Sequence, residues 1–276
     1  MADVLFEKRP DGVGLITLNR PESLNAMGGR LLPMLGEYLE QCAADREVRC
    51  VAVTGAGRAF CAGGDVKGMQ TRNTRSSSAT SDGAPNIAAM LEGTVDELRD
   101  WHNSTALLLH TMPKPTVALV NGVAVGAGLS VALACDIRIA SDTARFGTAF
   151  KNIALSGDFG GAYFLPRLVG AAKARELYFS AEIMGAQAAL ELGIVNRVVA
   201  QAEFMEEGMA YCAKLAAGPT ATYARMKRNL NLGETGTLQE VLDQEAFYQR
   251  LGGFSRDSRE AVTAFVEKRD PVFVGE

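Results

Sequence analysis

Residues Pro113–Ser141 have the sequence PKPTVALVNGVAVGAGLSVALACDIRIAS, and the elements that it predicts set the fold class. Thr116–Val120 is a short apolar run typical of a buried strand. A glycine loop, Asn121–Gly128, follows this strand, and Gly128–Cys135 has helical spacing. Ile137–Ala140 is a further short strand. Buried strands that alternate with helices favour an α/β core.

The sequence before this stretch has the same order of elements. Val13–Leu18 is a strand candidate that ends at a turn, and Leu31–Cys42 has apolar residues on one helical face. Arg49–Thr54 is a short strand that leads into another glycine loop, Gly55–Gly64. Thr71–Asn86 is rich in Ser, Thr and Gly and is predicted to be a mobile loop.

The rest of the chain is predicted to be mostly helical. The expected helices are Leu91–Leu109, Ala171–Phe179, Ala186–Leu192, Gln201–Ala217, Thr220–Asn231, Leu238–Leu251 and Ser255–Lys268. We therefore predict a core over residues 1–200 and a helical C-terminal region over residues 201–276 that serves oligomerisation.

Composition excludes several classes of protein. The net charge of −4 gives no basic excess for non-specific binding of nucleic acid or an anionic membrane. No apolar run reaches the roughly 18 residues that a bilayer requires, and the N-terminus lacks the layout of a secretion signal. The five cysteines show no CxxC spacing, and two histidines cannot make a three-histidine metal site. We expect a cytoplasmic enzyme without a metal.

The two glycine loops are the strongest chemical signal. Each follows a buried strand, and glycine lets a ligand approach the main chain closely. The loop Asn121–Gly128 runs directly into a predicted helix, whose free N–H groups bind anions or oxyanions. An alternative is that these glycines only form turns.

The first loop also has a nucleotide-binding interpretation. VTGAGRAF is similar to the opening of G-x-G-x-x-G, but Phe60 stands where the third glycine is required. The region about 20 residues later, Arg75–Ser78, offers no acidic residue for a ribose. A nicotinamide-dependent dehydrogenase is therefore disfavoured.

Five segments together resemble the crotonase (enoyl-CoA hydratase/isomerase) superfamily. They are ITLNRPESLNAM (16–27), AFCAGGDVKGM (59–69), PKPTVALVNGVAVGAGLSVALACDIRIAS (113–141), LPRLVG (165–170) and AFVEKRDPVF (264–273). The resemblance implies a spiral of repeated ββα units with a C-terminal helical region, assembled as a homotrimer or a dimer of trimers. It also implies an acyl-CoA substrate, so that CoA enters with the substrate and no separate cofactor is needed.

The resemblance assigns roles to particular positions. The N–H groups of Gly64 and Ala127 match oxyanion-hole donors, and backbone groups of Ala62 and Val66 match positions that read the adenine. Lys268 matches a lysine that approaches the CoA of a neighbouring subunit, and Phe265 matches the aromatic residue beside it. For Lys268 the alternative is an ordinary solvated helix face.

The acid–base positions depart from the hydratases of the family. Their two glutamates fall on Ser130 and Phe150, neither of which acts as a base at neutral pH. Asp158 matches the acidic residue of the isomerase-like branch, although it is also a good helix N-cap before Gly160. In the variable stretch, Trp101 is expected in the core or the pocket wall.

We predict a CoA-thioester isomerase that shifts a double bond, with Asp158 as acid and base. Three alternatives remain: residual hydration, a hydrolase of thioester or carbon–carbon bonds that uses a carboxylate from Thr71–His110, and a non-catalytic acyl-CoA-binding protein. His102, Asp96 and Glu97 are further polar candidates in that stretch, for which surface positions are favoured.

Overall fold

The computed structural model describes residues 2–66, 68, 70 and 87–276. Among these residues the strands form two sheets. The larger sheet has the order β1-β2-β3-β5-β7-β10, with bounds Val4–Lys8, Val13–Leu18, Cys50–Gly55, Thr116–Val120, Ile137–Ser141 and Arg197–Val199. The smaller sheet has the order β4-β6-β8-β9, with bounds Ala59–Cys61, Val123–Val125, Arg145–Gly147 and Met184–Gly185. The predicted loop Thr71–Asn86 lies outside the described residues.

The chain alternates between the two sheets as it proceeds. β3 belongs to the larger sheet and β4 to the smaller one, and the pairs β5–β6 and β7–β8 repeat this step. Pairing is parallel throughout, except for β1 with β2 and β8 with β9. The predicted α/β spiral of ββα units is confirmed.

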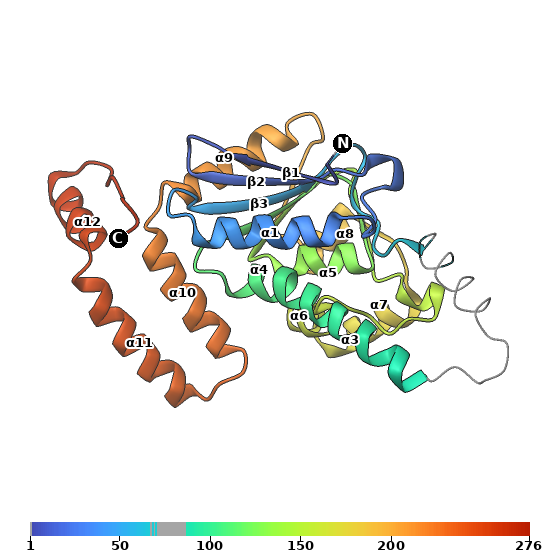
Figure 1. The fold of residues 1–276 in the computed structure, drawn as a ribbon. Coiled ribbons are helices and arrows are strands. Elements are labelled where there is room, and N and C mark those ends of the chain that lie inside the picture. Colours follow the sequence, from blue (N-terminus) through green and yellow to red (C-terminus); the bar gives the residue numbers. More distant parts are fainter. Residues whose placement is uncertain (1, 67, 69, 71–86) are drawn as a thin grey trace.

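Helices surround the sheets and continue to the C-terminus (Figure 1). They are α1 (Leu31–Ala44), α3 (Ile87–His102), α4 (Leu108–Thr111), α5 (Ala127–Ala134), α6 (Gly161–Val169), α7 (Ala171–Ser180), α8 (Ala186–Glu191), α9 (Phe204–Ala216), α10 (Thr220–Gly233), α11 (Leu238–Gly253) and α12 (Arg256–Glu267). Short 3₁₀ turns lie at Pro21–Ser23 and Phe150–Ile153, and a π-helical turn, η2, spans Asn103–Leu107. Among the described residues, no helix has the length and apolar character that crossing a membrane requires.

The larger sheet is buried on both faces, which explains its continuous apolar strands. Within β3, Val51 and Val53 face the cluster that contains α1 and α5, whereas Cys50 and Ala52 face α9. In Figure 1 α9 lies on one side of this sheet and α1 on the other. The sheet thus fixes the positions at which β3 and β5 end and the glycine loops begin.

Several elements differ from the sequence predictions. Each predicted glycine loop contains a three-residue strand, β4 or β6, which is too short to show a period of two. The predicted helix Leu91–Leu109 is interrupted by η2. For α6 only a possible start after Asp158 was considered, and its bounds were not predicted, because Gly161 opens the helix and Pro166 stands inside it.

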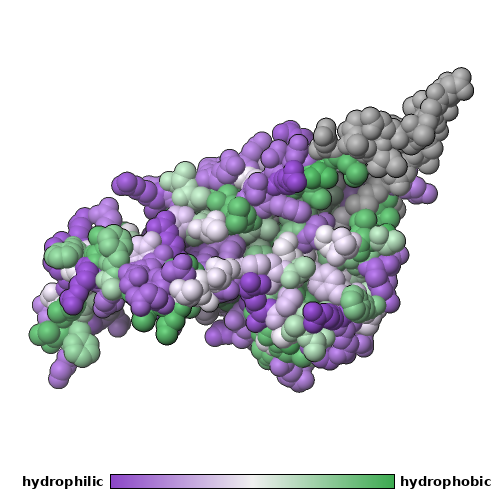
Figure 2. All heavy atoms as spheres, turned by 90° about the horizontal axis from the view of Figure 1, so that it is seen from below, coloured by the Kyte–Doolittle hydropathy of each residue, from purple (hydrophilic) through white to green (hydrophobic). Residues whose placement is uncertain are grey.

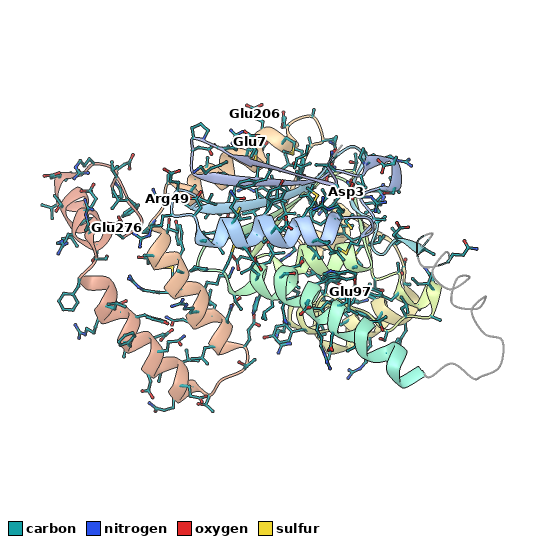
Figure 3. All side chains as sticks on the ribbon, viewed as in Figure 1. Asp3, Glu7, Arg49, Glu97, Glu206 and Glu276 are labelled. Atoms are coloured by element: carbon teal, nitrogen blue, oxygen red, sulfur yellow. The ribbon has the colours of Figure 1, made fainter. Side chains whose placement is uncertain are left out.

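We call α10, α11, α12 and residues 268–276 the tail, because this part lies beside the core (Figure 1). Among the described residues, neither apolar core cluster includes one beyond Ala216. Arg49, labelled in Figure 3, joins the two parts by donating to the carbonyl oxygens of Gly218 and Phe273 at 2.6 and 3.0 Å. The division at residue 200 and the oligomerisation role stay predictions.

Candidate active site

The two glycine loops meet in space because β4 and β6 pair in parallel. A side chain at Gly63 would place its Cβ 3.5 Å from the amide nitrogen of Ala127, and φ at Gly63 is +89°, which favours glycine. A Cβ at Gly128 would overlap the carbonyl oxygen of Cys61. Two backbones this close leave room for glycine alone, and the start of α5 is therefore held against the first loop.

Two amides at this junction are free to bind a ligand. Gly64 and Ala127 line the same cavity, and neither N–H donates a hydrogen bond to another described residue. Ala127 is the first residue of α5, where helical N–H groups have no partner within the helix. Neighbouring Gly63 is anchored separately, since its carbonyl oxygen accepts from the Met27 N–H at 2.7 Å. The two amides can stabilise a negative oxygen between them.

The cavity has a volume of about 430 Å³ and a largely apolar wall. The wall comes from the segment before α1, the first turn of α1, the two loops with the residues just after the first one, α3 and the loop before α6. Its residues are Met27, Gly28, Gly29, Leu32, Pro33, Gly64, Asp65, Gly68, Leu98, Trp101, Ala127, Asp158 and Phe159. Trp101 was predicted to lie either in the core or in the pocket wall, and it lines the wall.

Asp158 presents an unpaired carboxylate to this cavity. Its Oδ1 atom is buried and has no hydrogen-bond partner among the described residues. Burial raises the pKa of Asp158 to about 6, because a low-dielectric environment disfavours the charged form. The alternative that Asp158 caps a helix is wrong: the N-cap of α6 is Gly160, and no side chain caps that helix. The carboxylate is available for proton transfer.

Asp65 is the other carboxylate among the described wall residues, and it already has partners. Its Oδ1 accepts from the Gly68 N–H at 3.0 Å, and its Oδ2 lies 3.6 Å from Nη2 of Arg20. Arg20 also donates to the carbonyl oxygen of Ala26 at 2.8 Å. Sequence reasoning missed this pair, whose partners lie 45 positions apart. It braces the loop that carries Gly64.

The positions that match the hydratase glutamates are not acid–base groups in the structure. Ser130 Oγ donates to the carbonyl oxygen of Gly126 at 3.3 Å, which is an ordinary bond within a helical turn. Phe150 is buried and stacks on Tyr178 with ring centroids 6.1 Å apart. Burial, together with the charge of Asp158, raises the pKa of Tyr178 to about 12.

The four residues expected to bind CoA lie in different settings. The Ala62 N–H donates to the carbonyl oxygen of Leu24 at 2.9 Å, which leaves its carbonyl side for a ligand. Val66 is half exposed and follows Asp65, which lines the cavity. Phe265 and Lys268 are exposed on the tail and are not among the described residues that line the cavity of their own chain.

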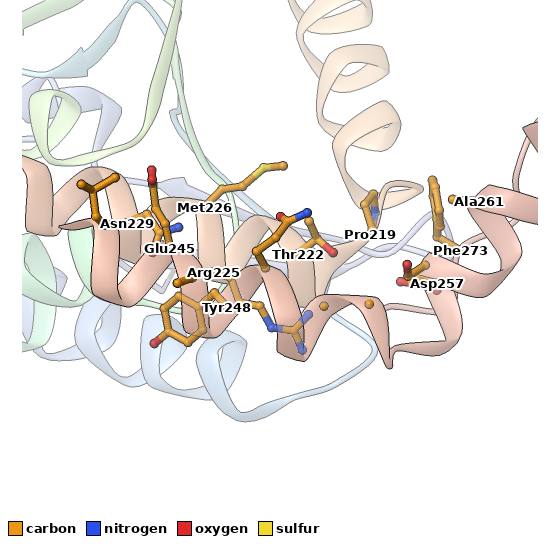
Figure 4. Close-up of a pocket in the computed structure, with 16 residues that line it drawn as sticks. Pro219, Thr222, Arg225, Met226, Asn229, Glu245, Tyr248, Asp257, Ala261 and Phe273 are labelled. Carbon is orange, nitrogen blue, oxygen red and sulfur yellow. The ribbon is translucent and has the colours of Figure 1, made fainter. Parts of the chain in front are cut away.

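A larger cavity, of about 700 Å³, lies between α10, α11 and α12 (Figure 4). Its residue Asp257 is occupied, because its carboxylate accepts from the N–H groups of Val274 and Gly275 at 2.7 and 2.9 Å. Arg225, which also lines it, has a buried Nη1 atom without a partner among the described residues. Gly64, Ala127 and Asp158 do not line this space.

Comparisons with known proteins identify the family of the chain. A family model described as enoyl-CoA hydratase/isomerase matches residues 8–276. The chain is 38% identical to the 1,2-epoxyphenylacetyl-CoA isomerase of Escherichia coli (strain K12), over 100% of each chain. It is 33% identical to the short-chain-enoyl-CoA hydratase of Clostridium acetobutylicum, over 97% of this chain and 95% of that one.

Solved structures give the same result. The crystal structure of an enoyl-CoA hydratase from Mycobacterium smegmatis matches with a TM-score of 0.86 at 30% identity, over 99% of both chains. The enoyl-CoA hydratase of Bacillus anthracis matches with a TM-score of 0.85 at 30% identity, over 100% of both chains.

Proposed function

Because the chain belongs to the enoyl-CoA hydratase/isomerase family, we propose that it moves a carbon–carbon double bond along the acyl group of a CoA thioester. One observation carries the proposal: an unpaired carboxylate, Asp158, shares a cavity with the free amides of Gly64 and Ala127. Together these groups suffice for a proton shift through an enolate.

The proposed reaction needs one base and one oxyanion site. Asp158, as a carboxylate, takes a proton from C2 of a 3-enoyl thioester. The electrons of the broken C–H bond move toward the thioester oxygen, and the N–H groups of Gly64 and Ala127 stabilise the resulting dienolate. Asp158 then returns the same proton to C4, and the double bond lies between C2 and C3. No water or second acid is consumed.

The environment of Asp158 suits this double role. A pKa of about 6 leaves the carboxylate mostly charged at neutral pH, yet basic enough to compete for a carbon-bound proton. Buried Phe159 beside it excludes water, which favours return of the proton to carbon over addition of water. Phe150 and Ser130 supply no second carboxylate, and so hydration by two carboxylates is disfavoured.

The test compares Asp158→Asn with the wild type on a 3-enoyl-CoA, with the 2-enoyl product measured by chromatography and mass detection. We expect kcat to fall by about 10²–10⁴-fold, the usual contribution of a positioned acid–base group. The matched control is Asp96→Asn, an exposed carboxylate on α3 that pairs with Arg99; its kcat stays at the wild-type level. Full turnover in Asp158→Asn contradicts the assignment.

The wall residues Trp101 and Phe159 support a narrower choice of acyl group. Aromatic side chains favour a flat, ring-bearing acyl group, through stacked or edge contacts. The E. coli relative is a 1,2-epoxyphenylacetyl-CoA isomerase, which makes a ring-bearing substrate the second candidate. A higher kcat/KM for a phenyl-bearing thioester than for a straight-chain one of equal carbon number supports it, and the reverse order excludes it.

The proposal includes a cytoplasmic homotrimer or a dimer of trimers, in which Lys268 and Phe265 reach the CoA of a neighbouring subunit. Exposed apolar side chains on the tail support this part, because the described residues of one chain do not cover them. CoA enters as part of the substrate, and neither a separate cofactor nor nucleic acid has a role.

A further inference from the structure

The loop that carries Asp158 has an unusual backbone. Phe159, the next residue, is buried and has φ of +47°, a left-handed conformation that an aromatic residue rarely adopts. Such a conformation persists only where neighbouring contacts hold it. Because one peptide plane joins Asp158 to Phe159, whatever holds Phe159 also restrains the backbone from which the Asp158 side chain starts.

His102 supplies that contact. The Phe159 N–H donates to Nε2 of His102 at 3.2 Å, and the two rings meet edge to face with centroids 4.8 Å apart. His102 is the last residue of α3, the helix that also gives Trp101 and Leu98 to the cavity wall. The side chain thus ties the loop before α6 to the opposite wall of the cavity.

The chemical state of His102 matches this role. An imidazole accepts through Nε2 only when it is neutral, with its proton on Nδ1. Burial lowers the pKa of His102 and so favours the neutral ring. The π-helical turn η2 begins at the next residue, Asn103. Extra residues of this kind inside helices often occur at functional sites, where they rotate the flanking side chains.

We propose that His102 is a positioning residue: it accepts the Phe159 N–H and thereby aims the Asp158 carboxylate at the substrate carbon. The proposal rests on the function proposed above, since it concerns the same carboxylate. His102 itself contacts neither the substrate carbons nor the transferred proton. Its effect is on the rate of proton transfer and not on the binding of the CoA thioester, which other residues hold.

Two variants separate hydrogen bonding from ring packing. His102→Phe keeps an aromatic ring against Phe159 and removes the acceptor, whereas His102→Gln removes the ring and keeps an acceptor at a similar reach. The matched control is His110→Phe. His110 also packs edge to face on an aromatic ring, Phe164, with centroids 5.2 Å apart, but it lies outside this cavity.

The readout is steady-state kinetics, with thermal unfolding as a check on folding. We expect His102→Phe to lower kcat by about tenfold or more with KM nearly unchanged, since a small misplacement of a reacting group is costly. His102→Gln recovers most of the rate, and His110→Phe equals the wild type. A wild-type kcat in His102→Phe overturns the inference, as does a His102→Gln variant that folds but is as slow as His102→Phe.

A second readout does not depend on the reaction. Hydrogen exchange at the Phe159 amide is slow in the wild type because the N–H is bonded, and we expect it to be about tenfold faster in His102→Phe and slow again in His102→Gln. If the wild type turns over no acyl-CoA but exchange follows this order, the proposed function fails and the positioning contact stands. Equal exchange in all three proteins overturns the contact itself.

Discussion

The core and the tail use their apolar residues in opposite ways. In the core, β3 and β5 are buried along their whole length, and a Cβ atom at Gly55, Gly122 or Gly128 in the glycine loops would overlap a backbone oxygen. In the tail, α11 buries none of its residues, and Figure 2 shows apolar side chains on its part of the surface. The apolar residues of the core are covered within one chain, whereas many of those on the tail are exposed.

This contrast gives different expectations for substitutions in the two regions. A change in the core acts through overlap or lost packing within one chain. A substitution in the tail is expected to act on contacts with a molecule that covers the tail.

Glycine to alanine gives the sharpest comparison. In Gly128→Ala the added methyl overlaps the carbonyl oxygen of Cys61 and pushes the two loops apart. We expect the free energy of unfolding to fall by about 1–3 kcal/mol and kcat by about 10²-fold. Gly233→Ala at the end of α10 meets no atom within 4 Å and leaves both quantities close to wild type. Chemical denaturation and kinetics of both variants measure this, and equal losses contradict the contrast.

The tail is tested by placing charge on its apolar face. Phe265 and Val266 are 85% and 75% exposed on α12. If a second copy covers them, the double variant Phe265→Asp/Val266→Asp dissociates, because a charge cannot be buried cheaply. Thr263→Asp, on the polar face of α12 with Glu260 and Glu267, stays assembled. Sedimentation at several concentrations decides between the two, and a double variant that remains in one assembly refutes the expectation.

Asp158 is expected to make the free energy of unfolding depend on pH. The folded-state pKa of Asp158 is raised from 3.8 to about 6, and therefore the charged carboxylate destabilises the fold by up to about 3 kcal/mol. As pH rises from 3.8 through 6, the free energy of unfolding of the wild type falls by up to about 3 kcal/mol, whereas that of Asp158→Asn does not. Denaturation midpoints should coincide below pH 3.8 and favour Asp158→Asn above pH 6. If the denaturation midpoints of the two proteins differ by the same amount at every pH from below 3.8 to above 6, the carboxylate is not buried.

The smallest effect is expected at Lys268. It is exposed at the end of α12 with φ of +59°, which asparagine tolerates. Lys268→Asn should raise KM for an acyl-CoA by about two- to fivefold with kcat unchanged, the range of an exposed charge pair. The KM for an acyl-pantetheine, which lacks the nucleotide, serves as the control and should not change. An equal rise for both thioesters rules out contact with the nucleotide end.

The sequence predicted the elements whose signal is local. The buried strands Thr116–Val120 and Cys50–Gly55 are continuous apolar runs, and the long helices show their period. The strands β4 and β6 could not be predicted, because three residues inside a glycine loop show no period, and their pairing links positions about 60 apart in the chain. The bounds of α6 could not be predicted, because Gly161 and Pro166 are residues that usually interrupt a helix.

The site followed the same rule. Gly64, Ala127 and Asp158 were named from motifs, and the structure brings them to one cavity. Whether Asp158 caps α6 depended on backbone angles at Gly160, which the sequence does not give. The contact between His102 and Phe159 joins residues 57 positions apart through one backbone amide. Such contacts leave no local pattern, and only the fold reveals them.

The central claim is that two main-chain amides converge on one thioester oxygen. A crystal structure with a non-reactive acyl-CoA analogue tests it most directly. The account predicts that the thioester oxygen lies about 3 Å from the nitrogens of both Gly64 and Ala127, with an Asp158 oxygen within about 3.5 Å of C2 or C4. A thioester carbonyl that points away from both amides, or binds in another cavity, would contradict it.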